Sequence, residues 1–399
     1  MITGAKFAVA GSVSGAMMAF TPVAVGIWIN SKKKIEDEDF IKVTGGRLCT
    51  RAGEYVTLCC MNINDDYFYL RENGDVAEFK PKGAFNALSE RFGDYGAREL
   101  FGKCFENYIT KSDIKFLNSS GINSIKLTLR PYLLFRNGKI SKEEPDFKRL
   151  DKLVKTCRKA GTYIILALDA DDFKTEKADI ASPGRAGLLC RNNLIKVWTA
   201  VSEHFRNEPA IAAYDILNAD GADLFADETA VENTVSCFKR TAMALRSAED
   251  EHALITDVPY ALVNKFDIGD GNFITEVKYS ELSGLENEDG LIITGRKMIN
   301  ETETVLRPDI RNKSVVFCDF KGKGYGSFLF AGKPSFDIVK DSYEDMTAKT
   351  ASLLTNKNYA LKEEENLVLK NDSGAVPKKK PRKRVKIYYT KGRNLKVGK

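Results

Sequence analysis

The chain has 399 residues, of which 43% are hydrophobic and 29% charged, so it is long enough for one large α/β barrel or two mid-sized domains. Two histidines and eight scattered cysteines without zinc-ligand spacing argue against a histidine triad or a zinc site, and no metal or cofactor is expected. The net charge of +6 is unevenly spread, because residues 378–399 hold eleven basic side chains and no acidic one. Without these eleven, 50 basic residues face 55 acidic ones, which predicts a mildly acidic body with a separate basic tail.

The first feature along the chain is a run of 25 uncharged residues, 7–31, rich in Ala, Gly, Val and Met. At ~1.5 Å per residue, a helix of this length spans the roughly 30 Å of a bilayer core. A cleaved signal peptide is the alternative, but the run is long and no clear Ala-x-Ala site precedes the lysines at 32–34. We therefore expect an uncleaved, single-pass membrane helix. The side of the membrane stays open, because these lysines favour a cytoplasmic body whereas long domains are exported regardless of such charges.

Strand-like and helix-like segments alternate in the rest of the chain. Residues 40–56 predict a small hairpin, and residues 146–160 and 190–206 predict amphipathic helices. The predicted strands cover residues 56–62, 122–129, 162–168, 211–217, 253–258, 273–279, 314–320 and 325–330. Eight strands alternating with helices indicate an α/β fold, a (β/α)8 TIM barrel. A doubly wound open sheet is the alternative, disfavoured because no glycine-rich phosphate loop follows a strand.

Three parts of the chain follow from this pattern. Residues 1–39 are expected to form the membrane anchor and a charged linker, residues 40–356 the barrel, and residues 357–399 a flexible polybasic tail. Cys59 and Cys60 are expected to point to opposite faces of a strand as buried thiols. Trp198 lies on an apolar helix face and is expected in the core, which leaves no tryptophan as a platform for a sugar.

The order of four segments resembles the family 5 glycoside hydrolases, the cellulase-like retaining barrel enzymes. Residues 53–62 (GEYVTLCCMN) resemble the first strand and residues 119–128 (SSGINSIKLT) the second. Residues 150–168 (LDKLVKTCRKAGTYIILAL) resemble the next helix with the third strand, and residues 197–218 (VWTAVSEHFRNEPAIAAYDILN) the approach to the fourth. The resemblance covers roughly residues 43 to 335 and implies a glycan as the binding partner.

The resemblance also implies two catalytic carboxyl groups, which a retaining glycosidase holds ~5 to 5.5 Å apart at the strand ends. In the family the fourth strand ends in Asn-Glu-Pro, and this Glu is the acid/base; here the same place reads Asn218-Ala219-Asp220. The family's nucleophile Glu follows a Gly near the end of the seventh strand, and Asp319 is the carboxylate expected at that place. We therefore expect Ala219 to mark a lost acid. In the alternative, Asp220 or the acidic turn at 169–172 supplies a displaced one.

The supporting positions of the family differ as well. Lys126 replaces the Arg that supports the nucleophile, and Asp169 replaces a His that closes the third strand. Of the His-x-Tyr motif on the sixth strand only Tyr279 remains, and the expected eighth strand, 325–330, lacks the Trp that lies beneath the sugar. Substrate contacts are therefore expected from Asn218, Tyr279, Lys126 and Asp169, and from the aromatic rings of Tyr132, Tyr325 and Phe328.

Several of these residues also have a structural interpretation. Asp319 paired with Lys126 would preserve an ion pair without catalysis. Asp169, Asp171 and Asp172 lack EF-hand spacing, which favours a solvated loop over a cation site.

Within the tail, residues 377–386 (PKKKPRKRVK) resemble a nuclear localisation signal. With an anchor at the other end, electrostatic attachment to an anionic surface is the simpler expectation. The sequence thus predicts a membrane-anchored, family 5-like barrel with impaired catalysis and a glycan-binding or scaffolding role, or, alternatively, a divergent cellulase-like or β-glucanase-like hydrolase that uses Asp319.

Overall fold

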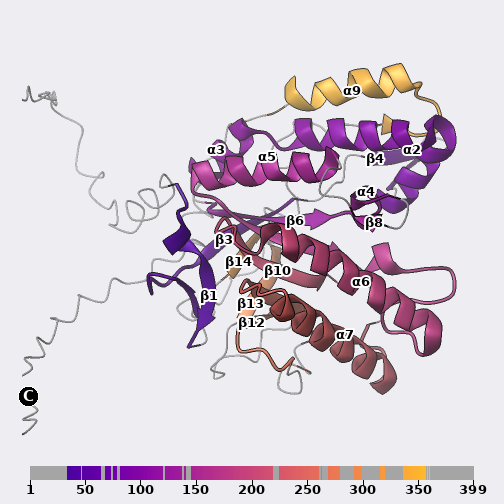
Figure 1. The fold of residues 1–399 in the computed structure, drawn as a ribbon. Helices are drawn as coiled ribbons and strands as arrows, with labels where there is room; N and C mark the ends of the chain where they lie inside the picture. Colours follow the sequence, from indigo (N-terminus) through magenta and orange to yellow (C-terminus); the bar gives the residue numbers. More distant parts are fainter. Residues whose placement is uncertain are drawn as a thin grey trace, which may run out of the picture.

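The protein is described from a computed structural model, and Figure 1 shows its course. The described residues are 34–45, 47–63, 68–72, 75–78, 81–119, 122–136, 139–140, 145–218, 224–259, 262, 268–278, 292–298, 315–319, 336–355, 357 and 359. Within these ranges no helix is both long and apolar enough to cross a membrane. The predicted anchor at 7–31 and the basic tail at 378–399 lie outside them.

Eight parallel strands form a closed barrel at the centre of the molecule. In barrel order they are β3 (Leu58–Ile63), β6 (Ser124–Leu129), β9 (Tyr163–Asp169), β10 (Ile211–Asn218), β11 (Ala253–Asp257), β12 (Phe273–Lys278), β13 (Ile292–Met298) and β14 (Val315–Asp319), and β14 pairs with β3 to close the ring. Strands such as β9 are apolar at nearly every position because both of their faces are buried. The predicted (β/α)8 barrel is confirmed.

One part of the strand prediction was wrong. The seventh barrel strand is β13, Ile292–Met298, which was not predicted, and the predicted seventh strand at 314–320 is β14, the eighth. The predicted eighth strand, 325–330, lies outside the described residues. The sequence IITGRKM of β13 contains a glycine and two basic residues and is not a continuous apolar run, so it did not give a strand signal.

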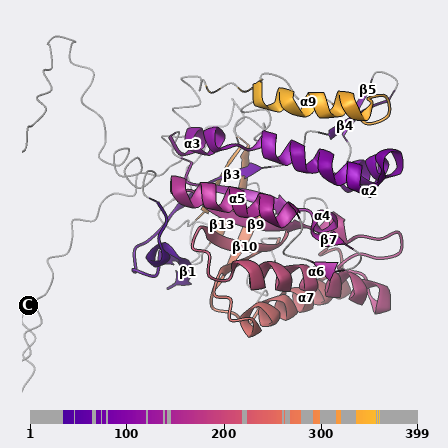
Figure 2. The same cartoon turned by 45° about the horizontal axis from the view of Figure 1, so that its top comes forward.

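Helices cover the outside of the barrel (Figures 1 and 2). They are α2 (Pro81–Tyr108), α3 (Lys111–Ser119), α4 (Pro131–Leu134), α5 (Pro145–Ala160), α6 (Gly184–Phe205), α7 (Glu228–Ser247) and α9 (Tyr343–Thr355), with short 3-10 helices η1 (Asp37–Asp39) and η2 (Ala170–Phe173). Both views place α9 over α2, α3 beside α5, and α6 beside α7. The predicted helices at 146–160 and 190–206 are confirmed as α5 and α6.

Short strands outside the barrel form three small sheets. They are the hairpin of β1 (Ile41–Thr44) and β2 (Arg47–Thr50), the sheet of β4 (Phe68–Glu72), β5 (Asp75–Glu78) and β15 (Phe336–Asp337), and the pair β7 (Phe135–Arg136) and β8 (Lys139–Ile140). The predicted N-terminal hairpin is therefore confirmed. Gly45 turns it with a φ of 58°, a conformation that side chains with a Cβ rarely adopt.

The hairpin seals one end of the barrel. Ile41 and Leu48 pack with inward-facing strand residues, among them Leu58 and Cys60, in a small apolar cluster. The backbone N–H of Val43 also donates to Oδ1 of Asn272 at 2.7 Å. The hairpin therefore occupies the end at which the parallel strands begin, opposite the end at which they finish.

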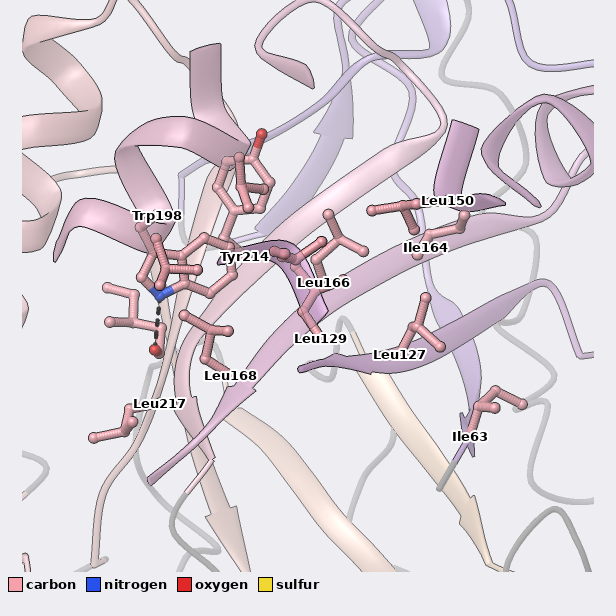
Figure 3. Packing of buried hydrophobic residues seen from close by; sticks show 14 of the residues in the cluster. Ile63, Leu127, Leu129, Leu150, Ile164, Leu166, Leu168, Trp198, Tyr214 and Leu217 are labelled. Atoms are coloured by element: carbon pink, nitrogen blue, oxygen red, sulfur yellow. Dashed lines mark hydrogen bonds between the residues drawn. The ribbon is translucent and has the colours of Figure 1, made fainter. Parts of the chain in front are cut away.

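A larger apolar layer lies between the barrel and its helices (Figure 3). Trp198 of α6 packs on Tyr214 of β10 with ring centroids 5.1 Å apart, and its Nε1 donates to the carbonyl oxygen of Ile216 at 2.8 Å. Both side chains are fully buried, so the predicted core position of Trp198 is confirmed. Cys59 belongs to this outer layer and Cys60 to the inner cluster, which confirms that the two thiols point to opposite faces.

Candidate functional site

Polar residues gather where β6, β9 and β10 end. Asn218, the last residue of β10, is in register with Asp169, the last residue of β9. Arg130 follows β6, and its Nη1 lies 3.3 Å from Oδ2 of Asp169 and 3.2 Å from Oδ2 of Asp172. Asp169 also accepts a hydrogen bond from the backbone N–H of Asp171 at 3.0 Å and so caps η2. The acidic turn is thus held by a guanidinium group, a partner that the sequence analysis did not identify.

A second polar cluster lies inside the barrel, below these strand ends. Nζ of Lys126 on β6 lies 2.5 Å from Oδ2 of Asp215 on β10 and 3.0 Å from Oε2 of Glu276 on β12. The side chain of Asp215 is 0% exposed, that of Lys126 3% and that of Glu276 10%. We refer to Lys126, Asp215 and Glu276 as the lumen trio.

Strand register explains why the members of the lumen trio meet. Lys126 is in register with Ile165, and Asp215 is in register with Ile255. Glu276 lies two residues after Ile274 on β12, and all three isoleucines belong to the inner cluster. Because side chains alternate along a strand and neighbours in register share a face, all three charged side chains point into the lumen.

The lumen trio has unusual protonation equilibria. Burial raises the pKa of Asp215 to about 6, although the ammonium group of Lys126 opposes the rise, and the charge of Glu276 adds to it. Burial also disfavours the charged form of Lys126, but Asp215 and Glu276 outweigh it and raise the pKa of the ammonium group above its ordinary range. A proton taken up by Asp215 removes one negative charge beside Lys126. The carboxyl group of Asp215 is therefore easier to protonate than that of an ordinary aspartate.

The sequence analysis identified only one member of the lumen trio, Lys126. Asp215 and Glu276 were missed, although each is the one acid within a strand of mostly apolar or β-branched residues (IAAYDILN and FITEVK). An isolated acid at an inward position of such a strand needs a buried partner, and this signal was available. The backbone of Asp319 ends β14, but its side chain is outside the described part, so its predicted pairing with Lys126 stays a prediction.

Of the other predicted site residues, some lie within the described part of the chain and others do not. Ala219, Asp220, Tyr279 and Phe328 lie outside the described residues, as does Tyr325, and their roles stay predictions. Tyr132 lies in α4 with its ring 4.9 Å from that of Phe85 and 6.2 Å from that of Phe101. Tyr132 thus packs at the edge of the outer apolar layer, and a contact with sugar through it also stays a prediction.

The corrected strand order affects the assignment of Asp319 to the nucleophile position. In the family pattern the nucleophile follows a Gly near the end of the seventh strand, and the seventh strand here is β13. In the sequence of β13, the residue that follows Gly295 is Arg296 and not a carboxylic acid. Asp319 ends the eighth strand instead, so its assignment to the nucleophile position depended on a strand count that the structure corrects.

A third polar cluster surrounds His252 before β11. Asp250 accepts hydrogen bonds from the backbone N–H of His252 at 2.9 Å and from the hydroxyl of Tyr214 at 3.0 Å, and His252 Nδ1 lies 2.7 Å from Oδ1 of Asp250. Burial pushes the pKa of Asp250 upward, but the hydrogen bonds and charge of His252 outweigh it and lower this pKa below its ordinary value. The cluster lies at the N-terminal edge of the barrel, away from the strand ends, so it has a structural role.

Seven cysteines are described with their side chains, and all seven are buried thiols. Burial raises the pKa of the thiols of Cys60, Cys104 and Cys157 far above the ordinary range, which keeps them protonated and unreactive. Among the described residues, no group of three or more His, Cys, Asp or Glu side chains is arranged to hold a metal ion.

A closed parallel barrel with polar residues at the C-terminal ends of its strands defines the class of (β/α)8 barrel proteins, whose sites lie at that face. The family model "Cellulase (glycosyl hydrolase family 5)" matches residues 89–260, which contain β6, β9, β10 and β11. Residues 89–260 are therefore similar to glycosyl hydrolase family 5, and the predicted resemblance is confirmed over this range.

Similar individual proteins were also found. A β-xylosidase of Phanerodontia chrysosporium is 25% identical over 231 residues, which cover 55% of this chain and 46% of the relative, so the match spans about half of the relative's length. Among solved structures, a β-glucanase from Saccharophagus degradans has a TM-score of 0.46 at 11% identity, covering 86% of this chain and 97% of the other. An endocellulase from Pyrococcus horikoshii has a TM-score of 0.44 at 11% identity, covering 79% and 98%.

Proposed function

We propose that this protein is a family 5-like barrel that binds a glycan at the C-terminal ends of its strands and lacks standard retaining hydrolysis. The observation that carries the proposal is the end of β10, the fourth barrel strand. β10 finishes at Asn218, and the next residue in the chain is Ala219. A methyl group cannot donate a proton, and a general acid contributes ~10² to 10⁴ in rate.

The described carboxylates inside the barrel do not replace this acid. Asp215 is fully buried beside Lys126, and Glu276 is engaged with the same ammonium group. Asn218, Asp169 and Arg130 remain at the strand ends with hydrogen-bonding groups suited to sugar hydroxyls. The part of the family site that survives is therefore suited to binding.

Attachment to a membrane belongs to the same proposal. Residues 7–31 supply an uncharged run of bilayer-spanning length, and residues 378–399 supply the charge that attracts an anionic surface. Removal of residues 1–31 should release the protein from membranes, and partition that persists in high salt after this removal would contradict the anchor.

A divergent hydrolase is the second candidate, favoured by Asp319 at the end of β14, where barrel enzymes place catalytic residues. The full chain should be assayed on aryl β-glycosides and β-glucans, and its affinity for oligosaccharides from these polymers should be measured by calorimetry. We expect binding that Asn218→Ala weakens, with negligible polymer hydrolysis. Hydrolysis that Asp319→Ala abolishes would establish the enzyme instead, and absence of both binding and hydrolysis would overturn the glycan role.

A further inference from the structure

A groove on the side of the barrel is lined almost entirely by lysines. It has a volume of about 450 Å³ and lies between α3 and α5. Its lining residues are Lys111, Lys148, Asp151, Lys152, Lys155, Thr156 and Lys159. We refer to this surface as the lysine groove.

Helical spacing concentrates the lysines of α5 on one face. Lys148, Lys152, Lys155 and Lys159 follow one another at intervals of four, three and four residues, and all four are exposed. Residues at these intervals share one side of a helix. The opposite side of α5 carries its buried apolar residues Phe147, Leu150, Leu153, Val154 and Cys157. The positive stripe is therefore the outer surface of a helix that is firmly packed on the barrel.

Five lysines line the groove against a single acid, Asp151. Its carboxylate lies 2.8 Å from Nε2 of His204. Glu106 lies 4.0 Å from Nζ of Lys152 but is also shared with Arg149 at 3.8 Å. The groove therefore presents a strong positive potential to solvent, to which an anionic partner is complementary.

Residues that precede and follow the barrel in the chain contact the two helices that border the lysine groove. The backbone N–H of Ile35 donates to the carbonyl oxygen of Arg158 near the end of α5 at 3.0 Å, and Nε of Arg158 donates to the carbonyl oxygen of Ile35 at 3.1 Å. At the other end of the chain, the hydroxyl of Tyr359 donates to Oδ1 of buried Asp113 on α3 at 2.7 Å. The described residues nearest in sequence to the predicted anchor and to the basic tail, Ile35 and Tyr359, thus contact α5 and α3.

We propose that the lysine groove is the surface through which the barrel lies on an anionic lipid bilayer, with its lysines binding lipid phosphate groups. The groove extends the proposed membrane attachment from the two chain ends to the folded body and is independent of the glycan-binding role. Its lining contains no aromatic side chain on which a nucleic-acid base would stack. None of its residues belongs to a strand end, so docking through it leaves the mouth of the barrel uncovered.

Vesicle binding of the full chain tests this proposal. Partition onto vesicles of phosphatidylcholine alone is compared with partition onto vesicles that also contain phosphatidylserine, and the ratio of the two isolates the electrostatic contribution. The triple variant Lys152→Gln/Lys155→Gln/Lys159→Gln should lower this ratio by on the order of tenfold or more, because each lysine near an anionic surface contributes roughly fivefold. The effect should disappear in high salt.

A matched variant controls for net charge. Lys177, Lys239 and Lys340 are exposed and lie outside the groove, so Lys177→Gln/Lys239→Gln/Lys340→Gln removes the same charge elsewhere. This variant should leave the ratio nearly unchanged, and an equal fall in both variants would overturn the proposal. A chain without residues 1–31 tests the anchor separately, because it should no longer partition onto neutral vesicles.

Lysine acetylation of the unmodified sequence gives a second measurement that does not depend on variants. The lysines of the groove should react at least several-fold more slowly on phosphatidylserine vesicles than on neutral ones, while Lys177, Lys239 and Lys340 react equally on both. Equal rates for the groove lysines would contradict membrane docking. Protection by an RNA oligonucleotide or by inorganic phosphate, without protection by the vesicles, would reassign the groove to a soluble polyanion.

Discussion

Asp215 and Asp250 are both completely buried, yet their surroundings shift their pKa values in opposite directions. Asp250 accepts a backbone N–H and a tyrosine hydroxyl and lies against the ring of His252, and these groups favour the carboxylate. Asp215 has the ammonium group of Lys126 as its main compensation and Glu276 as a competitor for it. Burial alone therefore does not fix the charge of a carboxyl group, because the number of donors and the sign of its neighbours decide it.

Removal of Lys126 should produce the largest effect. Lys126→Met leaves the carboxyl groups of Asp215 and Glu276 in the lumen without their cation, which should lower the free energy of unfolding by ~3–5 kcal/mol at neutral pH. Urea denaturation measures this change. Lys239→Met, on the exposed face of α7, is the control and should stay within ~0.5 kcal/mol of the unmodified protein. A loss below ~1 kcal/mol for Lys126→Met would show that the ion pairs of the lumen trio do not contribute to the free energy of unfolding.

The two aspartates should also differ in their pH dependence. The folded-state pKa of Asp215, about 6, lies above its ordinary value of 3.8, so between these values the folded chain binds more protons than the unfolded chain. Its contribution to the free energy of unfolding therefore falls as the pH rises from 4 to 6, by on the order of 3 kcal/mol. Asp250 has a lowered pKa, so its contribution is present above its ordinary pKa and is lost only at lower pH.

The measurement compares Asp215→Asn and Asp250→Asn with the unmodified protein by urea denaturation at several pH values. Relative to the unmodified protein, Asp215→Asn should become more stable as the pH rises from 4 to 6, whereas the difference for Asp250→Asn should be flat there. Parallel curves for the two variants would remove the distinction between the sites.

A smaller effect is expected from one of the donors to Asp250. Tyr214→Phe removes the hydroxyl that donates to Oδ2 of Asp250 but keeps the ring on Trp198. The free energy of unfolding should fall by about 1.5 kcal/mol, the lower end for a hydrogen bond to a charged group. Tyr55→Phe, at a ring that is 72% exposed, provides the control and should have no measurable effect. No difference between the two variants would mean that His252 alone maintains the carboxylate.

The sequence predicted the barrel because buried parallel strands and amphipathic helices leave regular patterns, as β9 and α5 show. It failed at β13, whose Gly295, Arg296 and Lys297 interrupt any apolar run. The strand belongs to the barrel because it pairs with β12 and β14, an arrangement that depends on long-range contacts and leaves no local signal.

The site was predicted less completely than the fold. The inward position of Lys126 follows from strand alternation, but its partners come from β10 and β12, 89 and 150 residues further along the chain. The alternation of side chains along a strand predicts which residues point into the lumen. It does not predict which strands face each other across the lumen. Arg130 was missed for a related reason, since the loop that turns it towards Asp169 has no sequence signature.

The β1–β2 hairpin has a consequence for the order in which the molecule assembles. Val43 is among the first described residues to be synthesised, and its partner Asn272 follows 229 residues later. At about 5–20 residues per second, the hairpin waits roughly 10 to 50 seconds on the ribosome before this contact can form. Until then its apolar residues Ile41 and Leu48 have only the earlier strands to pack against. The hairpin is thus synthesised early but is among the last parts of the barrel to reach its final surroundings.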